Sequence, residues 1–344
     1  MSVSTERLLE TLRCPSCHQV LSACAQDDGD PCLECTTCKA KFPVIRDIPR
    51  LLLSPLREAL LDNQLDGRNA NPEIKTALSF GFEWTQFPEM YDEWNQRFLD
   101  YMKPHAAEFF RGKKVLDAGC GNGRFAYYAA KYGAEVWAID LGSAVEVARR
   151  NTDQAGEVQV VQADLRRPPF AQESFDFIYS IGVLHHLSDP EEAFQGLLRY
   201  LKPGGMIQIY LYWKAERQPI KRALLAFVDV SRKITTGLPH RIVYALAYPA
   251  AAAAFGFFVW PYLLLKNTPR LKSFAEKLPM KQYSRFPFRV CVNDQFDRFS
   301  APIENRYTKQ QVADWLSRAR LETRSVGEAC GWLGTGRKPT SIAG

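Results

Sequence analysis

Short apolar runs and amphipathic segments alternate through the middle of the 344-residue chain. Apolar runs of strand length occupy residues 115–116, 135–139, 158–161, 175–180 and 206–212. Between the first two runs, the segment RFAYYAAKYG repeats apolar residues at helical spacing and ends at Gly133. Strands that alternate with helices predict an α/β fold with a parallel, doubly wound sheet, whose ligand lies at the carboxyl ends of the strands.

A different pattern follows the last of these runs. Residues 219–234 begin with Pro219 and place apolar residues on one helical face, and residues 242–265 carry no charge. The uncharged run is long enough to span a bilayer. Pro249, Pro261 and Gly256, and the return of both ends to one sheet, argue against spanning. We expect a helical insertion at residues 214–290 that rests on a membrane or covers an apolar acceptor, with an oligomer contact as the alternative.

Charge is concentrated in this insertion. The chain has a net charge of +6, but residues 214–290 contain 14 Lys and Arg and three Asp and Glu, a net of +11. The rest of the chain therefore sums to −5. A basic amphipathic segment suits an anionic membrane surface, whereas the small total excess does not favour a nucleic-acid-binding protein.

The first strand leads into a glycine-rich loop with the sequence KKVLDAGCGNG at residues 113–123. Such a loop brings backbone close to a ligand at a helix N-terminus. Its GxGxG spacing, two residues after Asp117, differs from the GxGxxG of dinucleotide-binding loops. Asp140 ends the second strand and could accept ribose hydroxyls. Asp164 follows the third strand and could meet an adenine amino group.

The segments VLDAGCGNG, AID, QADL, FDFIYSIGVLHHL and LKPGG occur in this order, and together they resemble the class I S-adenosylmethionine-dependent methyltransferases. The resemblance implies a Rossmann-like, seven-stranded sheet and S-adenosylmethionine as cofactor. It assigns cofactor binding to residues around four strand ends: Asp117, Gly119 and Gly121 for the methionine part, Asp140 for the ribose, Leu141, Ala163, Asp164 and Leu165 around the adenine, and Ser180 and Ile181 beneath the methyl donor.

Two histidines, His185 and His186, follow the fourth strand at the expected active face. Histidine is the natural base near neutral pH for an acceptor that must lose a proton. The alternative is that the pair only shapes the pocket; of the two, we favour His185 as the base. An FGFEW segment at residues 80–84 could cover the cofactor or pack on the sheet edge, and Asp297, Arg306 and Tyr307 could face the acceptor.

Six of the nine cysteines lie within the first 38 residues. Two CxxC pairs, Cys14 with Cys17 and Cys35 with Cys38, predict a closed tetrahedral site for a structural zinc ion. Cys32 is an alternative to Cys38 as the fourth ligand. Cys24 and Cys32 are otherwise expected to lie outside the metal site. Residues 7–54, including the FPV and DIP segments after Cys38, resemble the zinc ribbon of the Trm112-like family.

The predicted organisation is a zinc ribbon at residues 1–54, a linker with helices at 55–104, a methyltransferase core at 105–213 and 291–344, and the insertion at 214–290. The predicted function is methyl transfer to a small molecule or a lipid-linked saccharide, with O-methylation favoured. The alternative is an rRNA or tRNA methyltransferase whose ribbon binds RNA. Residues 1–13 lack an apolar leader segment, so we expect a cytoplasmic protein. If the insertion touches lipid, the protein is expected to be peripheral on the inner membrane surface. A homodimer is also considered.

Overall fold

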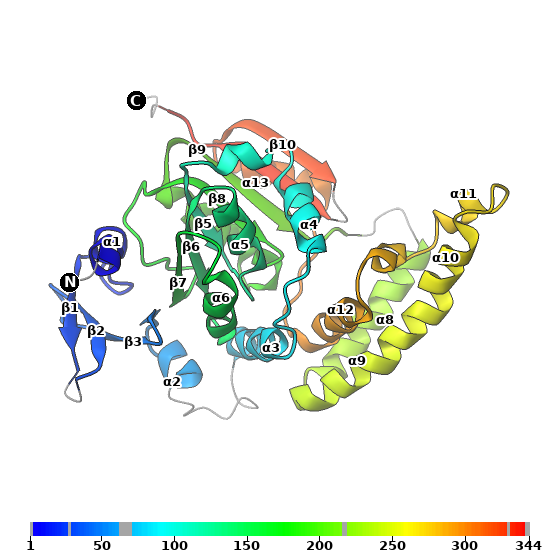
Figure 1. The fold of residues 1–344 in the computed structure, drawn as a ribbon, viewed down its shortest axis with the longest axis horizontal. Helices are drawn as coiled ribbons and strands as arrows, with labels where there is room; N and C mark the ends of the chain where they lie inside the picture. The colour runs from blue at the N-terminus through cyan, green and yellow to red at the C-terminus, as the bar shows by residue number, and fades with distance from the viewer. Residues whose placement is uncertain (1–2, 27–28, 62–70, 215–218, 329–330, 341–344) are drawn as a thin grey trace. The chain divides into compact units, whose positions relative to one another are not determined.

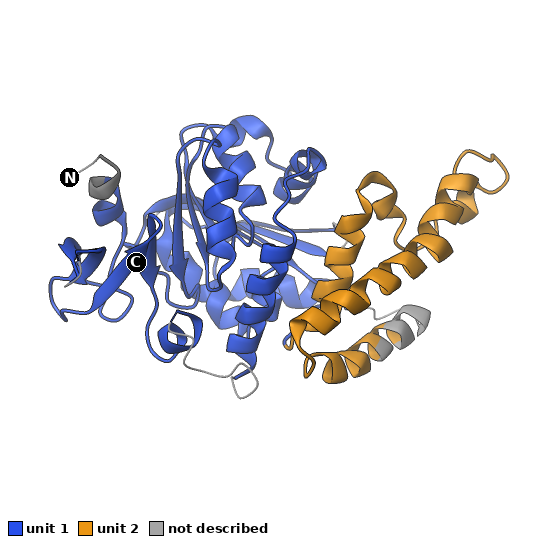
Figure 2. Cartoon of the chain, turned by 60° about the horizontal axis from the view of Figure 1, so that its bottom comes forward, with its two compact units in different colours: residues 1–216, 303–344 blue, residues 217–302 orange. Residues whose placement is uncertain are grey.

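The computed structural model describes residues 3–26, 29–61, 71–214, 219–328 and 331–340. The chain divides into two units, shown in two colours in Figure 2. Unit 1 contains residues 1–216 and 303–344, and unit 2 contains residues 217–302. Unit 1 thus includes both the cysteine-rich N-terminal segment and the predicted core.

A seven-stranded sheet forms the centre of unit 1, in the order β7-β6-β5-β8-β9-β11-β10 (Figure 1). The first five of these strands run parallel, and β11 runs antiparallel to both of its neighbours, β9 and β10. The bounds of the strands are β5 Lys114–Ala118, β6 Glu135–Asp140, β7 Val158–Ala163, β8 Phe175–Ile181, β9 Leu201–Leu211, β10 Glu322–Glu328 and β11 Trp332–Arg337. The predicted doubly wound, Rossmann-like sheet is confirmed.

Helices cover both faces of this sheet, because successive strand residues point to opposite sides. On β6, Val136 and Ala138 join one apolar core, while Trp137 and Ile139 join the other. The first core contains residues of α4 Glu93–Met102, α5 Arg124–Lys131 and α6 Ala144–Thr152. The second contains residues of α7 Pro190–Leu197 and α13 Lys309–Arg318. Strands buried on both faces explain the continuous apolar runs in the sequence.

The N-terminal segment extends the sheet beyond β7. After α1 Val3–Thr11, it forms β1 Leu21–Ala25, β2 Pro31–Cys35, β3 Lys41–Ile45 and β4 Ile48–Leu51, and α2 Leu56–Leu60 follows. The strand β4 pairs in parallel with β7, with Leu51 opposite Ala163. The buried Arg50 donates a 3.0 Å hydrogen bond to Gln162 Oε1 and forms an ion pair with Glu146. The ribbon and the core therefore share one sheet.

Unit 2 is helical. Its elements are α8 Pro219–Thr235, α9 His240–Ala254, a π-helical turn Phe255–Val259, α10 Trp260–Leu265, α11 Lys272–Ala275 and α12 Phe288–Ser300. The helix α12 packs against both α8 and α9. Thr235 Oγ1 donates a 2.6 Å hydrogen bond to the Phe299 carbonyl, which joins α8 to α12. Because of this packing, unit 2 extends to residue 302, past the expected end of the insertion at residue 290.

Candidate functional site

The carboxyl ends of β5, β6, β7 and β8 bring the predicted cofactor-binding residues to one edge of the sheet. Pairing places Asp117 opposite Ala138 and Tyr179, and Asp140 opposite Gln162. Residues distant in sequence become neighbours because parallel strands end at the same edge. The predicted positions on strands and in the loops after them are Asp117, Gly119, Gly121, Asp140, Leu141, Ala163, Asp164, Leu165, Ser180 and Ile181.

Asp117 is a buried carboxyl group on β5. The Tyr179 hydroxyl donates to its Oδ2 across 3.1 Å. Burial nevertheless raises the pKa of Asp117 to about 8, and the nearby Asp140 adds to the effect. A buried acid with a raised pKa gains from a cation beside it, and the methionine ammonium group of S-adenosylmethionine is such a cation.

Asp140 holds the glycine-rich loop. Its two oxygens accept hydrogen bonds from the backbone N–H groups of Gly121 and Gly142, each at 3.0 Å. Burial raises the pKa of Asp140, although these N–H groups favour the ionised form. A Cβ atom on Gly121 would lie 2.8 Å from Trp84 Nε1, and one on Gly119 would lie 2.4 Å from Val183 Cγ2. The loop is therefore a close-fitting backbone cradle, which suits the expected cofactor.

The FGFEW segment belongs to α3 Pro72–Gln86, which lies on the glycine-rich loop. Asn71 caps this helix by accepting a hydrogen bond from Ile74 N at 2.9 Å. Gly81 lets the helix approach Ser143, whose Oγ would be 2.6 Å from a Cβ at that position. Arg124, the first residue of α5, stacks on Trp84 at 4.8 Å and on Trp94 at 4.5 Å. Three helices thus meet over the loop.

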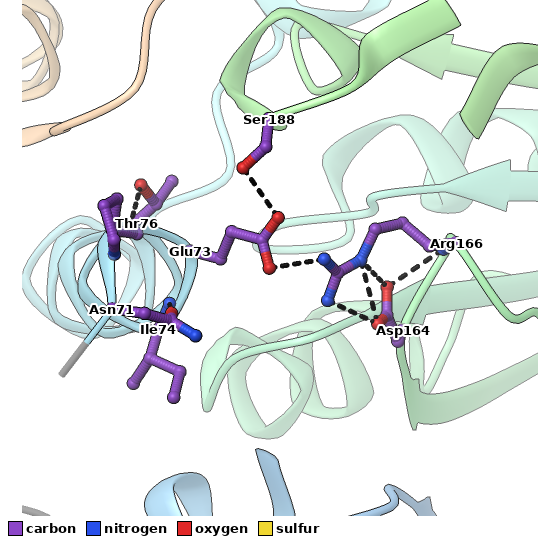
Figure 3. A network of polar contacts seen from close by, with 8 residues as sticks. Asn71, Glu73, Ile74, Thr76, Asp164, Arg166 and Ser188 are labelled. Carbon is purple, nitrogen blue, oxygen red and sulfur yellow. Dashed lines mark hydrogen bonds and ion pairs between the residues drawn. The ribbon is translucent and has the colours of Figure 1, made fainter. Parts of the chain in front are cut away.

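A charged network joins α3 to the end of β7 (Figure 3). Both oxygens of Asp164 accept hydrogen bonds from the Arg166 guanidinium, at 2.7 to 3.0 Å. Arg166 also forms an ion pair with Glu73 of α3, and Ser188 Oγ donates to Glu73 Oε1 across 2.7 Å. Asp164, expected to reach the adenine amino group, is thus paired within the protein. Sequence reasoning missed Glu73, which lies 93 residues from Arg166 with no motif connecting them.

Ser180 and Ile181 end β8, and both histidines lie in the turn that follows. Ser180 Oγ donates a 2.8 Å hydrogen bond to the Ala118 carbonyl and so ties β8 to β5. The His186 Nδ1 atom lies 2.6 Å from the Ile303 carbonyl, and its ring meets Phe80 edge to face at 4.8 Å. These contacts give His186 a structural position between α3 and the chain after unit 2.

His185 is fully buried and lies against the Tyr212 ring at 3.9 Å. Neither of its ring nitrogens makes a hydrogen bond to the residues that the structure describes. Burial lowers the pKa of His185 well below 6.5, and the nearby Tyr210 carbonyl, which favours the charged form, does not offset this. Its backbone carbonyl accepts hydrogen bonds from Asn305, which holds the turn in place. The imidazole is therefore neutral.

The four predicted ligand cysteines come together in the N-terminal segment. The Sγ atoms of Cys14, Cys17, Cys35 and Cys38 all lie within 4.8 Å of one another, a set that could hold a metal ion. Burial raises the pKa of the Cys35 thiol, but backbone N–H groups of Cys38 and Thr37 outweigh it and bring the pKa to about 6. A stabilised thiolate is the form that binds a metal.

Cys24 and Cys32 face each other across β1 and β2 and form a disulfide. Cys32 is therefore not a ligand in place of Cys38 in this structure. Cys24 and Cys32 thus lie outside the ligand set, as expected, and the disulfide between them is an addition to the prediction: the antiparallel pairing places their Cα atoms 4.9 Å apart.

The strand order, the glycine-rich loop and the acids at successive strand ends define a class I S-adenosylmethionine-dependent methyltransferase domain. Comparison with known proteins agrees with this class of domain. Residues 116–209 match the family model described as "Methyltransferase domain". This segment begins within β5 and ends within β9, so the match covers the glycine-rich loop and the turn with both histidines.

Two curated relatives share this part of the chain. A ubiquinone biosynthesis O-methyltransferase of Aliivibrio fischeri is 32% identical over 137 residues, which cover 39% of this chain and 56% of that protein. Phosphoethanolamine N-methyltransferase 1 of Triticum aestivum is 35% identical over 111 residues, which cover 31% of this chain and 22% of that protein. The chain spans about half the length of most curated relatives that it matches, and less of others.

Among solved structures, the chain is similar to a protein chain in the structure titled "Complex between the Haloferax volcanii Trm112 methyltransferase activator and the putative methyltransferase". The identity is 13% and the TM-score 0.42, and the match covers 76% of this chain and 97% of that one.

The raised pKa of Asp117 predicts that cofactor binding strengthens with pH. At pH 6 the carboxyl group is mostly protonated, and this neutral form does not attract an ammonium group. Ionisation as the pH approaches 8 restores the attraction, so the affinity for S-adenosylhomocysteine should rise by up to about ten-fold per pH unit below that value. Titration calorimetry between pH 6 and 8.5 measures this rise.

Asp117→Asn should bind more weakly at pH 8 and show a shallower pH dependence. The exposed Asp153→Asn, the same chemical change outside the site, should keep the wild-type slope. Wild-type affinity that stays constant across this range contradicts the assignment of Asp117.

Proposed function

We propose that the protein transfers the methyl group of S-adenosylmethionine to a small-molecule acceptor, with an oxygen atom as the favoured methyl acceptor. The observation that carries this proposal is the pair of carboxyl groups with raised pKa values, Asp117 and Asp140, at a glycine cradle, together with a neutral, buried His185 after the fourth core strand, β8. Both named relatives, an O-methyltransferase and an N-methyltransferase, support a small acceptor.

The protein's part in such a reaction is mainly alignment. When bound, S-adenosylmethionine supplies a methyl group on a sulfonium, which is already electrophilic. Asp117 favours the ammonium end, Asp140 lies where ribose hydroxyls are expected, and α3 over the loop keeps out water. Orientation and exclusion of water supply most of the rate in an in-line displacement of this kind.

A hydroxyl acceptor also has a proton to lose, and we assign His185 as the base that takes it. Its pKa well below 6.5 keeps the imidazole neutral at physiological pH. His186 is less suited, because its Nδ1 is already engaged with the Ile303 carbonyl. The Asn305 bonds to the His185 backbone hold the ring position independently of its nitrogens.

The acceptor class is tested by following the label from S-adenosylmethionine with a tritiated methyl group. The purified protein is incubated with an extract of the source cells, which is then separated into water-soluble small molecules, chloroform–methanol-soluble material and nucleic acid. We expect label in the water-soluble small molecules or in the chloroform–methanol-soluble material. Label in the chloroform–methanol-soluble material supports a lipid-linked saccharide. The Asp117→Asn variant is the background control.

Label that appears only in nucleic acid favours the RNA methyltransferase alternative and contradicts a small-molecule acceptor. Label in no fraction, from a protein that binds S-adenosylhomocysteine, contradicts methyl transfer itself.

His185→Ala should lower turnover of a hydroxyl acceptor found in this way by about 10²-fold, because the proton then leaves without a base. The KM for S-adenosylmethionine should change little. In the wild type, turnover at saturating S-adenosylmethionine should be constant from pH 6.5 to 8 and fall only at lower pH, where the imidazole becomes protonated.

His186→Ala is the matched control and should reduce turnover less at each pH. Two results for His185→Ala contradict the assignment of the base: near-wild-type turnover, or a raised KM for S-adenosylmethionine with little loss of turnover.

We further propose that the four-cysteine cluster holds a structural zinc ion. Cys14, Cys17, Cys35 and Cys38 leave no open coordination position. Zinc would stabilise a segment whose own core is small, and because β4 pairs with β7, loss of the ion should also weaken the sheet.

The purified protein should contain one zinc ion per chain by inductively coupled plasma mass spectrometry, and Cys17→Ser should lose it. The melting temperature of that variant should fall, by roughly 2–4 °C for each kcal/mol of stability lost. The double variant Cys24→Ser/Cys32→Ser should retain the ion. Full zinc content in Cys17→Ser would refute the ligand set.

A further inference from the structure

Large apolar side chains on the surface are concentrated in unit 2. Two of those that the structure exposes, Val20 and Ile45, lie in the N-terminal ribbon. The other twelve all lie in unit 2: Val230, Ile234, Ile242, Leu246, Tyr248, Phe257, Trp260, Leu263, Leu264, Leu271, Phe274 and Phe288. Scattered apolar residues are normal on a protein surface, but such a concentration indicates an interaction site.

Five of these residues form a stripe along the continuous helix His240–Leu265. They recur at the spacing of one helical face and are 46 to 77% exposed: Ile242, Leu246, Phe257, Trp260 and Leu264. The small residues Val243, Ala247, Ala251 and Ala254 are buried on another face of the same helix, which packs on α12. All five residues of the stripe remain exposed to solvent in the part of the chain that the structure describes.

This helix is, by length and composition, the one helix among the described residues that could cross a membrane, and 28% of its apolar window is buried. The helices that pack with it, directly or through α12, are not apolar. The α12 helix carries Asp294, Asp297 and Arg298, and α8 carries Asp229 and Arg232. Crossing a bilayer would take these charged neighbours into hydrocarbon at a high cost. Lying at the surface keeps them on the water side while the stripe enters the interface.

Cations gather directly after the stripe. Residues 266–285 contain six Lys and Arg and one acid, Glu276, and that acid already pairs with Lys281. Leu271 and Phe274 are exposed within this basic segment, and Trp260 precedes it. Exposed apolar side chains, a Trp at their border and unpaired positive charge are the features that bind proteins to anionic bilayers.

We propose that unit 2 is a membrane-binding unit, whose stripe inserts into the interface of an anionic bilayer while residues 266–285 contact the headgroups. A second copy of the chain fits less well, because a symmetric contact would bring two basic segments together. The proposal rests on unit 2 alone and holds whether or not the chain transfers methyl groups. If it does, a lipid-anchored acceptor would be available at the same surface.

Binding is tested by floating the full-length protein with vesicles, without cofactor or acceptor. Vesicles of phosphatidylcholine with 30% phosphatidylglycerol, a fraction chosen as roughly that of an anionic membrane, are compared with phosphatidylcholine alone. We expect binding to the anionic vesicles at low salt and much weaker binding at high salt or without the anionic lipid.

Two variants separate the contributions of the stripe and the charge. Phe257→Ser/Trp260→Ser/Leu264→Ser should lose at least about ten-fold in partitioning, because it removes the apolar area that would be buried. Arg270→Gln/Lys272→Gln/Lys277→Gln should lose about a hundred-fold on anionic vesicles only. The matched control is Val20→Ser/Ile45→Ser, which changes exposed apolar residues outside unit 2 and should bind like the wild type.

Absence of flotation of the wild-type protein at low salt overturns the proposal. So does equal binding by the stripe variant and the ribbon control. Sedimentation velocity covers the remaining alternative: a wild-type dimer that the stripe substitutions convert to a monomer, without vesicle binding, would assign the stripe to a second copy instead of lipid.

Discussion

The backbone that follows β5 is approached so closely from three sides that three of its positions have no room for a side chain. A Cβ atom at each glycine of the loop would meet a different element: Val183 after β8 at 2.4 Å from Gly119, Trp84 of α3 at 2.8 Å from Gly121, and Ala148 of α6 at 2.9 Å from Gly123. The positions of these three elements therefore depend on the absence of a side chain at three positions of one short loop. The same absence leaves backbone N–H groups available, one of which binds Asp140.

This close packing also determines the electrostatics of the site. Asp117 and Asp140 lie on adjacent strands, and burial raises the pKa of both carboxyl groups. Arg124 attracts the Asp117 carboxylate, but burial outweighs this attraction, so such a site still gains from a cationic ligand. At the neighbouring strand end, Asp164 already has its cation in Arg166. The carboxylate at the expected adenine end is thus paired within the protein, while Asp117, at the expected methionine end, keeps a raised pKa.

Sequence patterns were sufficient for the features that depend on local order. Apolar runs predicted the parallel strands, and the acids at their ends predicted which residues meet at one edge. Features formed by distant side chains could not be predicted. The Glu73–Arg166 ion pair and the parallel pairing of β4 with β7 join segments with no shared pattern. The helix α12 was expected in the core, since its sequence does not show that Thr235 and Phe299 bind each other.

The net charge differs in sign between the insertion and the rest of the chain. The insertion carries a net of +11 between residues 214 and 290, and the rest of the chain a net of −5. The negative part contains the buried acids, which attract a small cation over short distances in a site of low dielectric. The positive part exposes its cations to solvent, where only a densely charged partner such as a lipid surface binds strongly. Because the stripe residues are exposed and belong to no core, their substitution should remove membrane binding while leaving the glycine-rich loop and its acids intact.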